Sequence, residues 1–517
     1  MEVFRREFHL TVTNGTTPSF LMSSNSTNTI DLSQYVSNLD ENVYTIFNLP
    51  EEVIAVIFAY VSRSSASFRD NLAKLLADEE LAVSDHHAHG ARLVSQKASR
   101  FHEKWVVGYG HSSVAEHAIA HIGVEKISRL ASAELELANS FNSFTEYSQR
   151  YQRPKRGEYY LPPELESDPQ TKETYIRLNE EAYTVYEQLL TQLIPHLKST
   201  LSQGEKESER AFQSRIEKIA FEDARYVLTL ATQTSLGMTG NGRALRDTLV
   251  RLLTSPYPES QRLAHALEKE ISQVIPTLLR HVKPNQYLHH SRQALAKREA
   301  APTEQISGTT HQPSARFTEL PDYETTLNKL MEQLLIHLGY SYEEAHTHSK
   351  SLTIGEKEER MQDALQHLQF FDNPMELFQH VHYQVEMKIS EANWHQLLRH
   401  NRGARFTYGE PTTRFGYTIP PHIKEAGLTK LYSSFIEQAT TIQQQLAQSH
   451  PLIAPYCVTN AHHRQITMTA SMWEMYHLIN LRTSPEAQWD IRIVFEELLS
   501  TWSNQHPILA RYAKRRL

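Results

Sequence analysis

The chain has 517 residues, of which 40% are hydrophobic and 22% charged, a composition typical of a globular protein with several domains. A formal net charge of -8 argues against a dedicated binder of nucleic-acid polymers, which needs a basic face, but leaves room for a small anionic ligand. The single cysteine, Cys457, excludes a disulfide framework and a multi-thiolate metal site. The early apolar run at 53–61 is too short to cross a bilayer, so we expect a cytoplasmic protein without a membrane partner.

In chain order, the predicted elements form two similar blocks. Residues 1–50 are an N-terminal appendage without an assigned function, 51–285 are the first block, 286–316 are a polar linker without apolar period, and 317–517 are the second block. ARYVLTL at 224–230 has a counterpart in APYCVTN at 454–460, and the tripeptide Thr-Ser-Pro follows each at a similar interval. This recurrence predicts one domain duplicated in tandem.

Each block mixes strand and helix patterns. Residues 118–124 and 381–387 alternate with strand period, whereas 171–197 and 361–371 have helical period and charged outer faces. The predicted fold class is therefore α+β, with two copies of a domain that combines helices with a mostly antiparallel sheet.

The first block carries polar residues that suit a nucleotide. Glu146, Ser148 and Arg150 alternate in NSFTEYSQRY, so an extended segment would present all three on one side. Arginine binds phosphate oxygens in a fork, serine donates to phosphate, and glutamate accepts from a ribose hydroxyl or ring nitrogen. A charged strand edge has the same pattern. Further along lie Arg225 and, at a helix start where asparagine also serves as a cap, Asn241 with Arg243.

The second block contributes a polar helical face. In NWHQLLRHN, Gln396, Arg399 and His400 stand at i, i+3 and i+4, an arrangement that suits an anion or a flat polar heterocycle, and equally a solvated amphipathic helix. Arg482 ends a predicted helix whose apolar face includes Met475, and it would also complement the helix dipole there.

Taken together, six segments resemble the flavin-dependent thymidylate synthases. They are HSSVAEH, FTEYSQRY, ARYVL and NGRALRD in the first block, and HQLLRH and INLRTSP in the second. The resemblance rests on their order and spacing and covers most of both blocks. It implies FAD, NADPH as the reductant, 5,10-methylenetetrahydrofolate as the one-carbon donor, and deoxyuridine monophosphate (dUMP) as the substrate. Because such enzymes are homotetramers of a single block, a tandem chain implies a homodimer.

The two blocks depart from the family pattern in complementary ways. In the first block, ELANS at 136–140 replaces the basic triplet with an apparent two-residue length difference, and Leu252 or Leu253 replaces the late arginine. The second block keeps Arg399-His400-Asn401 without a third basic residue. There Pro455 replaces the arginine kept as Arg225, Ser471 and Trp473 replace Asn241 and Arg243, and residues 410–414 echo the Glu/Ser/Arg trio at a different distance.

The resemblance therefore implies one composite site built from both blocks. Arg399 and Arg482 would be catalytic and stabilise negative charge on the uracil. The substrate would contact Gln396, Arg399 and Arg482 from the second block and Glu146, Ser148, Gln149, Arg150 and Arg225 from the first. The FAD wall would comprise Ser113, Glu146, Asn241, Arg243, Asp247, Arg399, His400 and Asn401. His111 lies near that wall or is structural, and Cys457 is expected to be a buried thiol rather than a nucleophile.

Two alternatives remain open at this stage. A metal enzyme would use Asp85, His86, His87, His89 and His102, although only Asp85 and His89 have helical i, i+4 spacing, and we expect no metal. A catalytically inactive, FAD- or nucleotide-binding regulatory homologue is suggested by Asn401 and by the lost first triplet.

Overall fold

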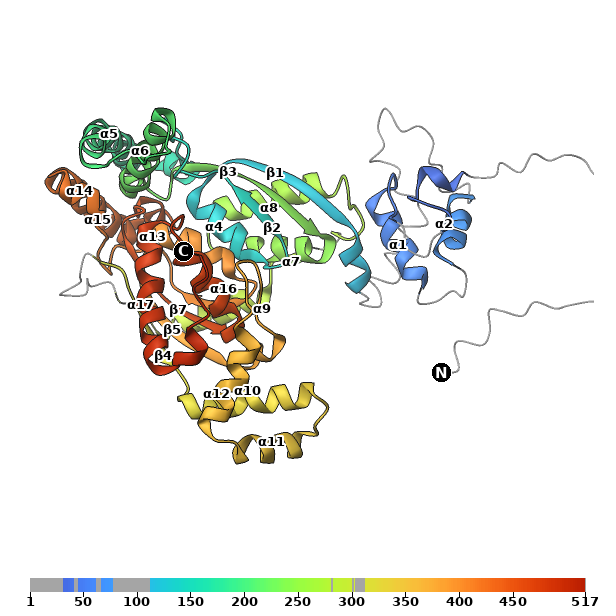
Figure 1. Cartoon of the computed structure of the whole chain (residues 1–517). Helices are drawn as coiled ribbons and strands as arrows, with labels where there is room; N and C mark the ends of the chain where they lie inside the picture. Colours follow the sequence, from blue (N-terminus) through green and yellow to red (C-terminus); the bar gives the residue numbers. More distant parts are fainter. Residues whose placement is uncertain are drawn as a thin grey trace, which may run out of the picture.

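The computed structural model describes residues 31–40, 45–61, 67–77, 112–279, 282–299, 302 and 312–516 (Figure 1). The histidine-rich stretch at 85–89, His102 and His111 lie outside these ranges. The first elements are η2 (Leu32–Gln34), α1 (Glu51–Val61) and α2 (Phe68–Ala77). A small buried cluster joins Tyr35 and Leu49 to Val53 and Ile57 of α1. Residues on both sides of the predicted boundary at position 50 therefore pack together.

The first half continues with a three-stranded antiparallel sheet in the order β1-β3-β2, with α4, α7 and α8 packed in one buried cluster with it. Its elements are η5 (Ser112–His117), β1 (Ile119–Ser128), α4 (Arg129–Ala138), β2 (Ser143–Glu146), η6 (Pro163–Ser167), α5 (Pro169–Thr200), α6 (Glu209–Ala224), η7 (Arg225–Val227), β3 (Gln233–Asn241), α7 (Gly242–Leu253) and α8 (Pro258–Ile271).

The predicted linker contains regular structure. Helix α9 (Gln286–Ala296) begins where the Asn285 side chain accepts from the backbone N–H of Leu288, and strand β4 (Ser314–Glu319) pairs with β5 of the second half. The helix buries none of its residues, which explains why the sequence has no apolar period there. A segment without a period of apolar residues can still form a helix when that helix is exposed to solvent.

The second half is built around a four-stranded antiparallel sheet in the order β4-β5-β7-β6. Its elements after β4 are α10 (Tyr323–His337), α11 (Tyr342–Ser351), α12 (Ile354–Leu365), η8 (Glu376–His380), β5 (His382–Ser390), α13 (Glu391–Leu397), η9 (Leu398–His400), β6 (Ala404–Tyr408), α14 (Pro421–Glu425), α15 (Thr429–Ser449), η10 (Ala454–Cys457), β7 (His463–Ser471), α16 (Met472–Arg482), α17 (Trp489–Gln505) and α18 (Pro507–Ala510). The helical prediction for 361–371 is correct only as far as Leu365.

The two halves share an order of strand, helix, strand, long helix, 3-10 turn, strand and two helices around β1-β3-β2 and β5-β7-β6, with α6 as an additional helix in the first half. Ser128 caps α4 as Ser390 caps α13, and Phe144 pairs with Met238 as Phe406 pairs with Met468. The interval from serine to phenylalanine is the same in both halves. The two-residue length difference expected from the sequence is therefore wrong, and Arg399-His400-Asn401 corresponds to Leu137-Ala138-Asn139.

Main-chain pairing joins the halves around an approximate two-fold axis. Leu230 N–H donates to Val458 O at 2.8 Å and Asn460 N–H donates to Leu228 O at 2.9 Å, while α5 and α15 share one apolar cluster. Polar contacts repeat across the axis, because Tyr226 and Ser390 both donate to Asp490, and Tyr456 and Ser128 both donate to Glu259. The halves thus meet twice, in two related junctions.

Cys457 lies beside this pairing, at the end of a 3-10 turn rather than in a strand. It is fully buried, and burial raises the pKa of its thiol, as expected for a structural cysteine. Among the described residues, none of the helices combines the length and apolar character needed to span a membrane.

Candidate functional site

We name the two junctions after their side chains. The arginine junction comprises Arg129, Glu136, Glu146, Arg150 and Arg225 of the first half with Gln396, Arg399 and Arg482 of the second. The tyrosine junction comprises Glu134, Arg251 and Tyr257 of the first half with Glu391, Tyr408, Glu410 and Arg464 of the second. The strand registers and the helix caps show which positions are equivalent in the two halves. Glu134 is the equivalent of Gln396, and Tyr408 is the equivalent of Glu146.

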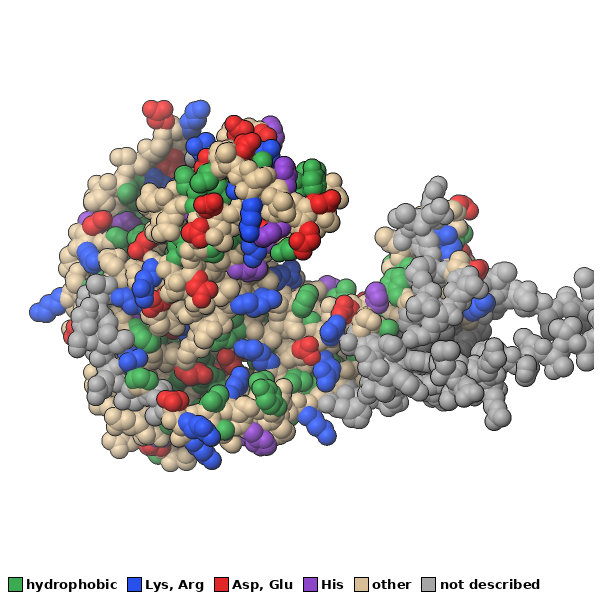
Figure 2. Space-filling view, turned by 90° about the horizontal axis from the view of Figure 1, so that it is seen from below, with side chains coloured by type: hydrophobic (Ala, Val, Ile, Leu, Met, Phe, Trp, Pro, Cys, Tyr) green, Lys and Arg blue, Asp and Glu red, His purple; other side chains and the backbone are tan. Residues whose placement is uncertain are grey.

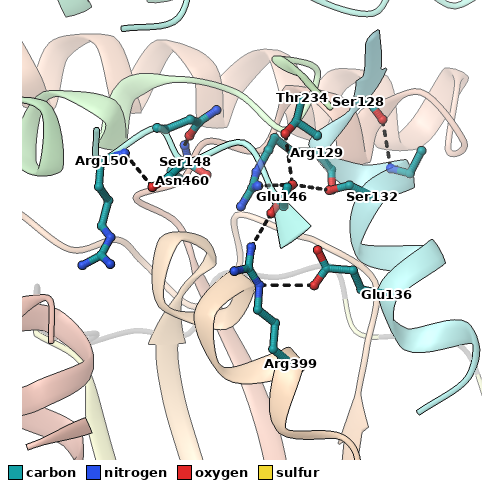
Figure 3. Close-up of polar contacts among 12 residues, drawn as sticks. Ser128, Arg129, Ser132, Glu136, Glu146, Ser148, Arg150, Thr234, Arg399 and Asn460 are labelled. Carbon is teal, nitrogen blue, oxygen red and sulfur yellow. Dashed lines mark hydrogen bonds and ion pairs between the residues drawn. The ribbon is translucent and has the colours of Figure 1, made fainter. Parts of the chain in front are cut away.

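Arg399 connects the two halves within one chain. Its Nη2 donates to Glu146 Oε2 at 2.6 Å, and its Nε lies 3.4 Å from Glu136 Oε2 (Figure 3). Glu146 also accepts from Arg129, and from the hydroxyls of Ser132 and Thr234 at 3.0 and 3.1 Å. Burial by itself would raise the pKa of Glu146, but the guanidinium groups of Arg129 and Arg399 lower it below the usual value. Glu146 is therefore an ionised anchor for Arg399.

Glu136 has the opposite behaviour. Burial raises its pKa to about 7, repulsion by Glu146 acts in the same direction, and Arg399 and Arg129 oppose the shift. Its carboxylate oxygens are buried and accept no hydrogen bond. At neutral pH this group is thus poised between its two protonation states beside Arg399.

Arg225 is a buried guanidinium without a bonded carboxylate. Its Nη2 donates to Gln488 Oε1, which also accepts from Gln396 Nε2 at 2.7 Å, and its own Nε is buried without a partner. Burial lowers the pKa of Arg225 to about 10, so the group stays cationic at neutral pH. Nearby, Gln149 accepts from Asn460 at 3.4 Å while its amide nitrogen is buried without a partner. Buried donors without a partner are rare in proteins, so these two suggest an oxygen-rich ligand.

Arg482 is a half-buried arginine that also lacks a carboxylate partner. Its Nε and Nη2 lie 3.1 and 2.6 Å from His400 Nε2, and Nη2 also donates to Gln396 O at 2.8 Å. Burial lowers the pKa of Arg482 to about 10. Burial, together with repulsion by Arg482, lowers the pKa of His400 well below its usual value. A neutral His400 therefore orients Arg482 without neutralising it.

His400, Glu474 and His477 gather closely enough to suggest a metal site. Arginine can only donate, so His400 Nε2 must carry the lone pair and Nδ1 the hydrogen. That hydrogen points toward Glu474 Oε1, which lies 3.6 Å from Nδ1. Nδ1 has no lone pair left for a cation in this arrangement, and we assign no metal to the cluster.

The Glu/Ser/Arg trio does not lie along one strand. Strand β2 ends at Glu146, and the chain then turns, with Tyr151 N–H donating to Ser148 O. Ser148 Oγ accepts from the backbone N–H of Arg150 at 3.4 Å, and Arg150 Nη1 pairs with Glu222 at 3.2 Å. The expectation that an extended segment presents all three side chains on one side is thus wrong. The turn begins at Ser148 and directs Arg150 away from Glu146 (Figure 3).

The residues expected around FAD fall into two groups. In the first half, Asn241 caps α7, Arg243 pairs with Glu116 at 2.6 Å, Asp247 pairs with Arg246 at 3.2 Å, and Ser113 is exposed. In the second half, Arg399 and His400 make the contacts given above, and Asn401 donates to Glu136 O at 3.0 Å.

A short chain of contacts leads from one group toward the other. Arg402, next to Asn401, donates to Asn142 O at 3.3 Å, and the Asn142 side chain donates to Thr248 of α7 at 2.7 Å. Asp247 precedes Thr248 in the same helix. The two groups are thus close to a common helix, although no direct contact joins them among the described side chains.

At the tyrosine junction, the buried arginine has a carboxylate partner within the protein. Arg464 pairs with Glu391 at 2.9 Å and lies over the rings of Trp394 and Tyr408, while Tyr257 donates to Glu410. Leu137 and Leu252 occupy the positions of Arg399 and Arg482 and pack in apolar clusters. Of the two leucines expected to replace the late arginine, Leu252 is the one at the matching distance from the cap of its helix.

Two members of the arginine junction, Arg129 and Glu136, and their neighbour Gln488 were not predicted from the sequence. Arg129 directly follows a strand, Glu136 lies in the segment that was noted only for its lost motif, and Gln488 lies in a loop before α17. The counterpart of Arg129 is Glu391, so comparison of the two blocks in the correct register would have flagged Arg129 as a charge reversal.

A separate cavity of about 460 Å³ opens on the first sheet and is lined by His121, Ile122, Gly123, Ser143, Phe144, Thr145, Gly237, Met238 and Thr239. None of the predicted site residues lines it. Figure 2 shows one face of the molecule, on which acidic and basic side chains are interspersed. The side chains of the arginine junction, rather than this cavity, mark the candidate site.

A family model described as thymidylate synthase complementing protein matches residues 47–277 and 323–508. A UPF0159 protein of Chlamydia muridarum is 24% identical over 93% of each chain, and one of Thermoplasma acidophilum is 23% identical over 81% of this chain and 89% of its own. A flavin-dependent thymidylate synthase of Clostridium tetani is 29% identical over 37% of this chain and 74% of its own. The crystal structure of the UMP/dUMP methylase PolB from Streptomyces cacaoi bound with 5-Br dUMP aligns weakly, with a TM-score of 0.32 and 12% identity over 39% of this chain and 94% of that one.

Proposed function

Because the chain belongs to the thymidylate synthase complementing protein family, we propose that it is a flavin-dependent thymidylate synthase with one composite site per chain. The chain would be a tandem duplication of the family domain, which is supported by the two matched regions and by the shared order of elements in the halves. The observation that carries the proposal is the pair of arginines, the buried Arg225 and the half-buried Arg482, that meet no carboxylate at the arginine junction.

The charges of this junction support an anionic nucleotide as the substrate. Burying a guanidinium without a carboxylate costs several kcal/mol unless a partner compensates it, so the buried Arg225 beside the half-buried Arg482 favours an anion that binds there. The substrate would be dUMP, held by Gln396, Arg399 and Arg482 on one side and by Gln149, Arg150 and Arg225 on the other, with Ser148 at the turn. Glu146 would act through Arg399, since its own oxygens are taken up by protein donors.

In the proposed reaction the one-carbon unit of 5,10-methylenetetrahydrofolate bonds to C5 of the uracil, its bonds to the folate nitrogens break to release tetrahydrofolate, and the C5 proton is lost. Arg482 and Arg399 stabilise the negative charge that develops on the uracil and so favour attack by C5. Reduced FAD, when bound, supplies the hydride that converts the transferred group into methyl, and NADPH restores the reduced state. The buried thiol of Cys457 takes no part, in keeping with a route without an enzyme nucleophile.

The chemistry of the donor set fits FAD in part. Arg399, His400 and Asn401 would hold it from the second half, and Ser113, Asn241, Arg243 and Asp247 from the first. The exposed Arg243 guanidinium suits a diphosphate, and the link through Asn142 and Thr248 brings α7 toward the arginine junction.

A homodimer of this chain would contain four domains, the number present in the homotetramers of the family.

The proposal is tested by adding excess FAD to the purified protein, recording its visible spectrum, and then supplying NADPH, dUMP and 5,10-methylenetetrahydrofolate. We expect flavin absorption bands that bleach on reduction, followed by formation of thymidylate. A protein that binds no flavin under these conditions would contradict the proposal. Bleaching without thymidylate would instead identify the inactive, nucleotide-binding homologue.

A further inference from the structure

Gln488 occupies the centre of the arginine junction. It is 1% exposed and stands at the cap position before α17. Its Oε1 accepts from both Arg225 and Gln396, and its Nε2 donates to the hydroxyl of Tyr226 at 3.0 Å. One amide thereby connects a first-half arginine to the second-half helix that carries Arg399.

The amide fixes Arg225 without cancelling its charge. The carboxylates around this arginine are bonded elsewhere, since Glu146 binds Arg129 and Arg399, and Glu222 pairs with Arg150. Asp490 accepts from Tyr226 and Ser390 rather than from Arg225. A neutral acceptor thus leaves a full positive charge, held in one orientation, with a free Nε–H.

The corresponding position in the tyrosine junction has a different chemistry. Tyr257 caps α8 as Gln488 caps α17, and it donates to Glu410. Pro455 stands there in place of Arg225, so no guanidinium needs to be oriented. An amide at the cap position therefore accompanies the arginine that lacks a carboxylate.

We infer that Gln488 is a positioning residue that holds Arg225 charged and available for the anionic part of a nucleotide substrate. This inference rests on the proposed function and adds a residue to its site. The inference explains why position 488 has a glutamine and not a glutamate. A glutamate would form an ion pair with Arg225 and compete with the substrate for it.

The nearly isosteric substitution Gln488→Glu tests the inference directly. A glutamate at this position pairs with Arg225, and we expect the dissociation constant for dUMP, measured by calorimetry, to rise at least tenfold. Thermal unfolding should stay within a few degrees of the wild type, because the new ion pair offsets the lost hydrogen bond to Tyr226. Gln488→Met serves as the uncharged control, which loses the orientation but adds no competing charge and should weaken dUMP binding less.

A double variant shows whether the effect passes through Arg225. Adding Gln488→Glu to Arg225→Ala should cause little further loss of dUMP affinity, because the charge to be neutralised is already gone.

Binding of deoxyuridine, which lacks the phosphate, shows which part of the substrate Arg225 contacts. A loss confined to dUMP assigns Arg225 to the phosphate, and an equal loss for both ligands assigns it to the uracil.

The outcomes separate this inference from the proposed function. If Gln488→Glu binds dUMP as tightly as the wild type, Gln488 does not protect the charge of Arg225, whatever the enzyme does. If the wild-type protein does not bind dUMP at all, both the inference and the proposed function fail.

Discussion

The arginine junction and the tyrosine junction have the same backbone plan and differ in how their charges are closed. At the arginine junction, the buried Arg225 and the half-buried Arg482 donate to amide, carbonyl and imidazole groups. At the tyrosine junction, the buried Arg464 has its own carboxylate in Glu391 and lies against aromatic rings. Two arginines thus lack a carboxylate at the first junction, whereas the buried arginine of the second has one, and Glu134 there accepts from the hydroxyl of Ser255.

Under the proposed function, this difference identifies the arginine junction as the one that binds the substrate. A buried arginine without a carboxylate weakens folding, and a bound anion would supply the missing charge. A buried arginine that already has its carboxylate, such as Arg464, needs no ligand. If the chain arose by duplication, one junction kept the ligand-binding residues and the other was free to become structural. Each of the following predictions contrasts the two junctions or tests how the arginine junction is assembled.

The largest contrast is expected for Arg482→Ala against Arg251→Ala. Removing a donor aimed at developing charge reduces turnover by a factor on the order of a hundred or more. Arg251, on the helix of the tyrosine junction, donates to Tyr408 at its exposed surface, and its removal should leave turnover near the wild-type value. Steady-state rates of thymidylate formation, with flavin content as the control for folding, measure both. Similar rates in the two variants would remove the distinction between the junctions.

The second prediction concerns the chain that supplies each wall. Arg399 contacts Glu146, and Gln396 shares Gln488 with Arg225, all within one chain. Arg225→Ala and Arg399→Ala should each be inactive, and co-expression of the two should restore nothing, because every site carries one lesion. Recovery to about a quarter of wild-type activity would show that the walls come from different chains of a dimer.

The sequence predicted much of the fold because the hydrophobic periods are local. Alternation at 118–124 and 381–387 marked β1 and β5, and the long helical period at 171–197 marked α5. The bend after Glu146 was missed because NSFTEYSQRY carries no glycine or proline to signal a turn. Helix α9 was missed because an exposed helix needs no apolar stripe.

The candidate site was predicted less completely, for a physical reason. Gln396, Arg399, Arg482 and Arg225 were chosen by resemblance, and the structure brings them together with Glu146. Glu136 lies far in sequence from Arg399, and Gln488 lies far from Arg225. Only tertiary packing creates the burial that raises the pKa of Glu136 and leaves Arg225 without a carboxylate. Burial of a charge is a property of the fold and cannot be read from local pattern.

A smaller effect is expected from Glu136→Gln, as a change in the pH dependence of stability. The pKa of Glu136 is about 7 in the folded protein and near 4.5 unfolded, so the folded state keeps a proton that the unfolded state releases. Its stabilising contribution is present below pH 4.5 and is lost as the pH rises through 7. Thermal unfolding should show the variant gaining on the wild type between pH 5 and pH 8.

Glu356→Gln is the control for this pH series. Hydrogen bonds from the backbone and side chain of Thr353 lower the pKa of Glu356, so it is already ionised throughout the window. Its unfolding temperature should run parallel to that of the wild type between pH 5 and pH 8. A parallel course for Glu136→Gln as well would mean that Glu136 is ionised in the folded protein.

The smallest effect compares two tyrosines related by the approximate two-fold axis. Tyr226→Phe removes the hydrogen bond to Asp490, and Tyr456→Phe removes the one to Glu259, so each variant should lose about 1 to 3 kcal/mol of unfolding free energy in urea. Only Tyr226 also accepts from Gln488, which orients Arg225. The dissociation constant for dUMP should therefore rise a few-fold in Tyr226→Phe and stay unchanged in Tyr456→Phe. Equal affinities in the two variants would show that Arg225 and Gln396 hold Gln488 in place without the hydroxyl, and that the two tyrosines are equivalent structural residues.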